Sequence, residues 1–126
     1  RYVVLTGGEP MLQVDAALID ALHAEGFTIA IETNGTQNVP RSIDWICVSP
    51  KAGSELVQRS GDELKLVWPQ AGSDVAMLAD LDFAHRLIQP LDDPNAAANV
   101  QACIDLVMAD PRWRLSLQTH KSLGLR

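Results

Sequence analysis

The chain has 126 residues, 47% of them hydrophobic, and its ten Lys and Arg against sixteen Asp and Glu give a net charge of -6. That size and apolar content suit one domain with a packed core. The acidic balance argues against nucleic-acid binding, because an acidic surface repels phosphate backbones. No apolar run approaches the ~20 residues of a membrane span. We therefore expect a cytoplasmic protein with no nucleic-acid or membrane partner.

The first element predicted is a strand, the apolar run from Val3 to Leu5. No initiating Met and no lead-in precede it, so we expect that a preceding segment is missing. A helix should begin at Pro10, because proline is favoured at the first helical position. Its apolar periodicity continues to about Glu25, and Gly26 provides the stop.

The remaining elements also alternate between strands and helices. Strands are predicted at 27–31, at 46–48 and before the motifs WPQ, QPL and QTHK. A short helix is predicted over 74–80, and a longer one from Asp93-Pro94 to Pro111. Segments 37–44 and 52–62 have too little periodicity for either element and are predicted as loops.

This order predicts an α/β fold, an incomplete TIM-like β/α barrel of mainly parallel strands that occupies residues 1–126 as one domain. Continuous apolar strands separated by helices are typical of parallel sheets buried on both faces. In such folds the loops at the carboxyl ends of the strands meet on one rim and carry the chemistry. The polar motifs that close the strands should therefore lie together.

The motif Thr6-Gly7-Gly8-Glu9-Pro10 joins the first strand to the first helix. Its glycines permit backbone angles that other residues avoid and let a ligand approach the backbone closely. Glu9 offers a carboxylate to an ammonium group. The alternative is a tight turn with a solvated Glu. The motif lacks the spacing of a phosphate-binding P-loop.

Two further motifs, ETNGT and SPK, close the next strands. Asn34-Gly35 is a strong turn signal, but the following apolar strand starts about ten residues later, so a hairpin is disfavoured. Lys51 follows a buried apolar run and is either an ordinary solvated lysine or a residue that faces a ligand on the rim.

The histidines and cysteines are the remaining candidates for catalysis and metal binding. His120, in the last motif, can donate to, accept from or protonate a substrate, whereas His23 and His85 are interpreted as structural. Cys47 and Cys103 lie in apolar contexts without metal-ligand spacing, which favours reduced core residues.

Taken in order, TGGEP, ETNGT, SPK, QP and LQTHK resemble the radical S-adenosylmethionine (SAM) enzymes, and within them the 7-carboxy-7-deazaguanine synthases of queuosine biosynthesis. The resemblance covers nearly the whole chain, and LQTHK is the motif that favours this family. It implies conversion of 6-carboxy-5,6,7,8-tetrahydropterin to 7-carboxy-7-deazaguanine with loss of ammonia. It also implies SAM, a [4Fe-4S] cluster and Mg2+ as cofactors, and a homodimer.

The resemblance also assigns residues. It implies that SAM is bound by the following residues: Thr6, Gly7, Gly8, Glu9, Asn34, Ser49 and Lys51. It implies that the pterin substrate contacts these: Thr6, Gly8, Gln89, Pro90, His120 and Arg126, the last through its carboxylate. The three-cysteine loop that holds the family's cluster is absent from the sequence, so no metal ligand is assigned and the chain alone is expected to be inactive.

Two other functions stay open. One is an activase that uses the same radical to modify a partner protein; such enzymes share the GGEP element, but the LQTHK ending is not expected in them. The other is a non-catalytic barrel fragment that binds a nucleotide-like molecule or packs against a partner.

Overall fold

A computed structural model describes residues 1–125. Its centre is a six-stranded sheet in which every strand pairs in parallel with its neighbour in sequence, in the order β1-β2-β3-β4-β5-β6. The strands are β1 (Tyr2–Leu5), β2 (Thr28–Thr33), β3 (Trp45–Val48), β4 (Ser60–Trp68), β5 (Asp82–Pro90) and β6 (Arg114–Leu115). The predicted parallel α/β class, a partial TIM-like barrel, is confirmed. All carboxyl ends of the strands lie at one edge of the sheet.

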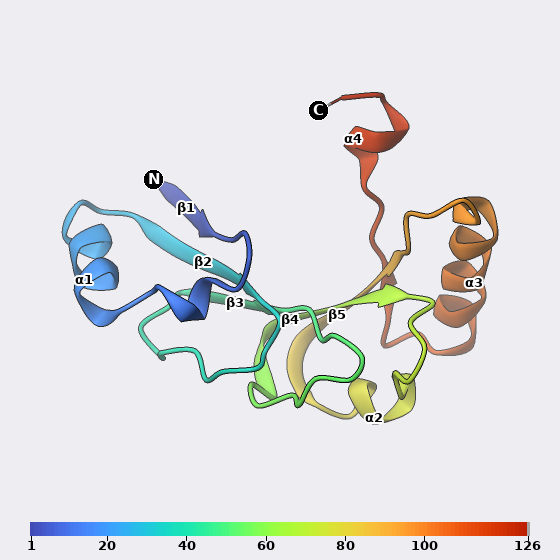
Figure 1. Cartoon of the computed structure of the whole chain (residues 1–126), viewed down its shortest axis with the longest axis horizontal. Coiled ribbons are helices and arrows are strands. Elements are labelled where there is room, and N and C mark those ends of the chain that lie inside the picture. Colours follow the sequence, from blue (N-terminus) through green and yellow to red (C-terminus); the bar gives the residue numbers. More distant parts are fainter. Residues whose placement is uncertain (126) are drawn as a thin grey trace.

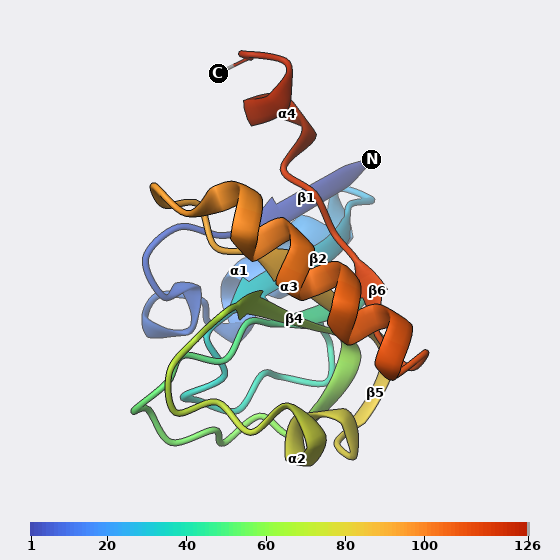
Figure 2. The same cartoon turned by 90° about the vertical axis from the view of Figure 1, so that its right-hand side faces the viewer.

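Helices surround the outside of the curved sheet (Figure 1). They are the 3-10 helix η1 (Pro10–Leu12), α1 (Ala16–Ala24), α2 (Val75–Ala79), α3 (Ala96–Ala109) and the short α4 (Thr119–Ser122). Only α4 stands away from the sheet, at the end of the carboxyl-terminal segment (Figures 1 and 2). No helix within residues 1–125 is long and apolar enough to cross a membrane.

Two hydrophobic clusters hold these helices against the outer face of the sheet. One joins β1 and β2 to α1 and includes Ile19 and Ile31, both fully buried. The other joins β4 and β5 to α2 and α3 and includes Leu66 and Cys103. Ile46 on β3 packs against both clusters. The burial of apolar area in these clusters is the main stabilising contribution to the layered arrangement.

Several predicted boundaries were wrong. The first helix does not run unbroken from Pro10, because Asp15 caps a new helix by accepting a hydrogen bond from the N–H of Leu18 at 2.8 Å. The longer helix begins at Ala96 rather than at Asp93, because the Asp93 carboxylate forms a turn by accepting from the Asn95 N–H at 2.8 Å.

The third wrong boundary concerns the last motif. QTHK was expected at the end of a strand, but β6 has only two residues and QTHK lies in the cap and body of α4. The remaining strand signals and the short helix near 74–80 are confirmed, but β4 begins at Ser60, within the segment 52–62 predicted as a loop, because Ser60 and Gly61 already pair with β5.

Candidate functional site

The carboxyl edge of the sheet carries a cavity of about 300 Å³ at the ends of β1, β2 and β3. Its lining residues come from three of the motifs: Thr6, Gly7, Gly8, Glu32, Thr33, Asn34, Ser49 and Lys51. The structure therefore brings together six of the residues predicted to bind the cofactor. Glu32 and Thr33 are additions, and the ETNGT motif contained the signal for both.

The two glycines of the first motif have positive φ angles, 87° at Gly7 and 55° at Gly8, and a Cβ added to either would meet nothing within 4 Å. Glycine is thus favoured here by backbone conformation rather than by crowding. The open space beside both residues lets a ligand approach the backbone amides and carbonyls directly.

Glu9 has a different environment from the one expected. Its Oε1 accepts hydrogen bonds from the Thr33 hydroxyl at 2.6 Å and from the Met11 N–H at 3.0 Å, and its Oε2 accepts from the Asn34 N–H at 2.7 Å. The half-buried carboxylate therefore ties the loop after β1 to the end of β2, and it is not among the residues that line the cavity. Direct contact of Glu9 with a ligand ammonium group stays a prediction.

The ETNGT segment is folded by its own side chains. Asn34 Oδ1 accepts from the Thr36 N–H at 2.9 Å, so its side-chain amide retains two N–H donors. Gly35, at φ 77°, has no room for a side chain, because an added Cβ would lie 2.7 Å from both Leu56 Cδ1 and Val48 Cγ1. The loop carbonyl of Gly35 accepts from the N–H groups of two residues in the following segment.

Glu32 supplies the carboxylate that does line the cavity. Its Oε2 accepts from Lys65 Nζ at 2.7 Å on the inner face of the sheet. Burial disfavours the charged form of Lys65, but the hydrogen bond to Glu32 and the nearby acidic groups outweigh it and raise the pKa of Lys65. Glu32 is therefore paired with a charged ammonium at neutral pH while it lines the cavity.

Ser49 and Lys51 follow β3. The Ser49 N–H donates to the Thr33 carbonyl at 2.8 Å, which extends the parallel ladder by one residue and fixes the hydroxyl at the rim. Lys51 is exposed and lies between this cavity and a neighbouring one near α2. One space is thus surrounded by a hydroxyl, an ammonium, an amide and a carboxylate. These donors and acceptors fit a ligand that bears both a positive and a negative charge.

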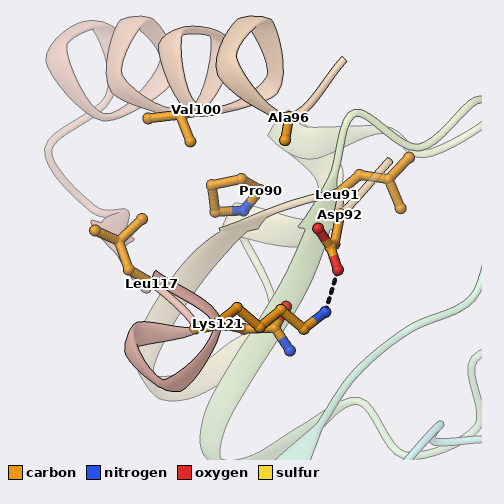
Figure 3. A pocket seen from close by; sticks show the side chains of 8 residues that line it. Pro90, Leu91, Asp92, Ala96, Val100, Leu117 and Lys121 are labelled. Atoms are coloured by element: carbon orange, nitrogen blue, oxygen red, sulfur yellow. Dashed lines mark hydrogen bonds and ion pairs between the residues drawn. The ribbon is translucent and has the colours of Figure 1, made fainter. Parts of the chain in front are cut away.

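A second cavity of about 120 Å³ lies at the ends of β5 and β6, beneath the start of α3 (Figure 3). Its lining residues are Pro90, Leu91, Asp92, Ala96, Val100, Leu117, Gln118 and Lys121. Lys121 on α4 forms an ion pair with Asp92, which attaches α4 to the loop after β5.

The predicted substrate residues do not share one cavity, because Thr6 and Gly8 line the first cavity and only Pro90 lines the second. Gln89 precedes Pro90 at the end of β5. His120 lies on α4, is exposed, and lines neither cavity. Arg126 lies outside the described residues. Gln118 and Lys121 belong to the LQTHK motif but were assigned no role, whereas Asp92 lies in a loop and had no distinguishing pattern in the sequence.

The described residues, 1–125, contain no group of three or more His, Cys, Asp or Glu side chains able to hold a metal ion. Both cysteines are unpaired and buried. Burial raises the pKa of Cys47, and it raises the pKa of Cys103 to about 11. These two thiols do not fit an iron-sulfur cluster, which needs ionised thiolates grouped around it.

Comparison with known proteins finds relatives that share one name. The chain is 61% identical over 126 residues to the 7-carboxy-7-deazaguanine synthase of Bradyrhizobium diazoefficiens, covering 100% of this chain and 60% of that protein. Over its whole length the chain is thus similar to a 7-carboxy-7-deazaguanine synthase. The synthase of Escherichia coli is 34% identical over 139 residues, which cover 99% of this chain and 61% of that protein. No protein-family model matches the chain.

The fold gives the same result. The crystal structure of QueE from Escherichia coli superimposes with a TM-score of 0.73 at 30% identity, covering 94% of this chain and 56% of that one. The chain therefore spans about 60% of the length of the curated relatives it matches.

Proposed function

We propose that the cavity at the ends of β1, β2 and β3 binds SAM. The observation that carries this proposal is the convergence of backbone at Gly7 and Gly8, the Lys51 ammonium, the Ser49 hydroxyl and the Glu32 carboxylate on one space of about 300 Å³. SAM has an ammonium, a carboxylate, a sulfonium and a ribose diol, so it needs donors and acceptors of both charges.

In this proposal each residue has a separate task. Lys51 and Ser49 donate to the carboxylate of the methionine moiety, and Thr6 and the carbonyls of the glycine loop accept from its ammonium. Asn34 and Glu32 take the ribose hydroxyls. Glu9 orients these loops from behind through its three hydrogen bonds, and any direct contact it makes with the ammonium adds to that role.

We propose further that the full-length protein converts 6-carboxy-5,6,7,8-tetrahydropterin to 7-carboxy-7-deazaguanine with loss of ammonia, a carbon-nitrogen lyase reaction. In the full-length protein a [4Fe-4S] cluster would supply the electron for cleavage of SAM, and Mg2+ would assist at the substrate. Because residues 1–125 do not fit either metal group, we assign no ligand of this chain to them. The chain itself, as one domain, contributes cofactor and substrate residues only.

The second cavity is proposed as the substrate side of the site. Gln89 and Pro90 are expected at the pterin, together with Thr6 and Gly8 from the loop after β1, His120 from α4 and the Arg126 carboxylate. We propose a cytoplasmic homodimer that acts on this small molecule and has neither a nucleic-acid nor a membrane partner.

The test is anaerobic reconstitution of the full-length protein with iron and sulfide, followed by reductant, SAM, Mg2+ and the carboxytetrahydropterin. Release of both 7-carboxy-7-deazaguanine and 5′-deoxyadenosine is the expected result, and residues 1–126 alone should release neither. Cleavage of SAM with no change in the pterin, accompanied by radical labelling of a partner protein, would replace the synthase proposal with an activase.

A further inference from the structure

One motif has no place in the proposed site. Trp68-Pro69-Gln70 closes β4, and none of its residues lines the cavity between β1 and β3. Gln70 is half-buried and lies beside the loop that follows β3, the loop that carries Lys51.

The side-chain amide of Gln70 bonds to the backbone on both sides of Lys51. Its Oε1 accepts from the Ala52 N–H at 2.6 Å, and its Nε2 donates to the Pro50 carbonyl at 3.3 Å. One amide thus satisfies a donor and an acceptor two residues apart, as a neighbouring strand would. The same Nε2 lies 3.5 Å from the Val67 carbonyl of its own strand, which orients the amide.

Lys51 needs such support because of where it lies. The residue is exposed, its loop continues into a turn closed by the Ser54 N–H to Lys51 carbonyl bond at 3.2 Å, and its side chain borders two cavities. A four-carbon ammonium side chain loses considerable rotamer entropy when it is held in one place. A fixed backbone at Lys51 narrows the positions that the ammonium can reach and lowers that cost.

We propose that Gln70 is a positioning residue, which fixes the backbone at Lys51 so that the Lys51 ammonium reaches the SAM carboxylate. This inference rests on the proposed SAM site. The competing explanation is that Gln70 contributes only to folding stability. The two differ in whether the effect of Gln70 on SAM binding passes through Lys51.

The first measurement is independent of the cofactor. In the SAM-free full-length protein, Gln70→Met should accelerate hydrogen exchange of the Ala52 amide about tenfold, because its acceptor is lost. Gln70→Glu should show exchange between those of the wild-type protein and Gln70→Met, because it keeps an acceptor for the Ala52 N–H but loses the donor to the Pro50 carbonyl. Gln101→Met is the matched control, since the Gln101 amide donates only to Asp105 on its own helix. Unchanged exchange in Gln70→Met overturns the inference.

The second measurement is a double-mutant cycle on SAM affinity, read by calorimetry in the full-length protein. Lys51→Met should raise Kd by roughly tenfold or more, and Gln70→Met by roughly fivefold. The double variant should bind within about twofold of Lys51→Met alone, because Gln70 no longer has an ammonium to position.

The outcomes separate the two proposals. Additive effects of the two substitutions, or a Gln70→Met protein with normal affinity, overturn the role of Gln70 and leave the SAM site intact. Normal affinity in Lys51→Met removes Lys51 from the proposed site, and with it the role of Gln70. A full-length protein that does not bind SAM at all refutes the proposed function itself.

Discussion

Glu9→Gln is the substitution that most directly separates the structural role of the GGEP carboxylate from a ligand-binding role. Gln keeps one oxygen, which can still accept from the Met11 N–H and the Thr33 hydroxyl. It places an NH2 group opposite the Asn34 N–H, which now donates to Glu9 Oε2 at 2.7 Å. Two donors then face each other, and one charge-assisted hydrogen bond is lost.

The structure gives the expected magnitude. A hydrogen bond to a charged group contributes about 1.5–3 kcal/mol, and a donor left without an acceptor adds a penalty of similar size when it is buried. Because Glu9 and Asn34 are only half-buried, water can take the freed donor and the lower part of that range applies. We expect the free energy of unfolding to fall by about 1.5–2 kcal/mol.

Urea unfolding of the wild-type protein and of Glu9→Gln measures this change in the free energy of unfolding. The slope of that free energy against urea concentration should be the same in both proteins. Glu25→Gln is the control, because that exposed carboxylate lies 4.0 Å from Arg1 and its loss should cost less than about 0.5 kcal/mol. Unchanged stability in Glu9→Gln together with a tenfold loss of SAM affinity would refute the bracing role and establish Glu9 as a direct ligand.

Three other perturbations test separate parts of the structure. Gly35→Ala should destabilise the chain by about 1–3 kcal/mol, since the added Cβ meets Leu56 and Val48 at 2.7 Å and φ is 77°; urea unfolding measures this, and a stable variant would show that the two side chains move aside at little cost. Hydrogen bonds from the Ile29 N–H and from His23 lower the pKa of Asp44 below its ordinary 3.8. As pH falls, the Asp44 carboxylate is therefore protonated first in the unfolded chain. Its contribution to the free energy of unfolding is complete above pH 3.8 and is lost as pH falls through the lower pKa of the folded state. Acid titration of the free energy of unfolding should therefore be flatter in Asp44→Asn, and curves of equal slope would contradict the assignment. Lys121→Met should lower the free energy of unfolding by less than about 1 kcal/mol, because its ion pair with Asp92 is exposed. It should nevertheless accelerate hydrogen exchange of the amides in 119–125. A double variant with Asp92→Lys and Lys121→Asp should restore the protection of these amides, and failure to do so would show that packing of Leu117 holds α4.

The sequence was sufficient for the parallel sheet and for most of the first cavity. Continuous apolar strands that end in polar motifs have few alternative arrangements, and TGGEP, ETNGT and SPK each follow a strand directly, so parallel pairing alone brings Gly8, Asn34 and Ser49 to one edge. The same pattern predicted Pro90 at the edge of β5.

The parts that were not predicted depend on side-chain contacts between segments distant in sequence. Glu9 and Glu32 are both carboxylates beside the rim, and only the coordinates show that the first is consumed by neighbouring donors while the second borders the cavity. No local pattern marks Gln70, because its partners Pro50 and Ala52 lie 20 and 18 residues earlier in the chain. The break before α1 depended on competition between two acceptable helix starts, Pro10 and Asp15, which propensity does not rank.

Ile46 connects the hydrophobic clusters that lie beneath the two cavities. It packs into the cluster beneath β1 and β2 and also into the cluster beneath β4 and β5, while the first cavity lies over the former strands and the second over β5 and β6. The shape of each cavity depends on the cluster beneath its own strands. The distance between the two cavities depends instead on how the sheet curves at β3, where Ile46 joins the clusters. Binding of a molecule that contacts both cavities would therefore depend on the curvature of the sheet. Substitutions at Ile46 would change the distance between the cavities, although Ile46 lines neither of them.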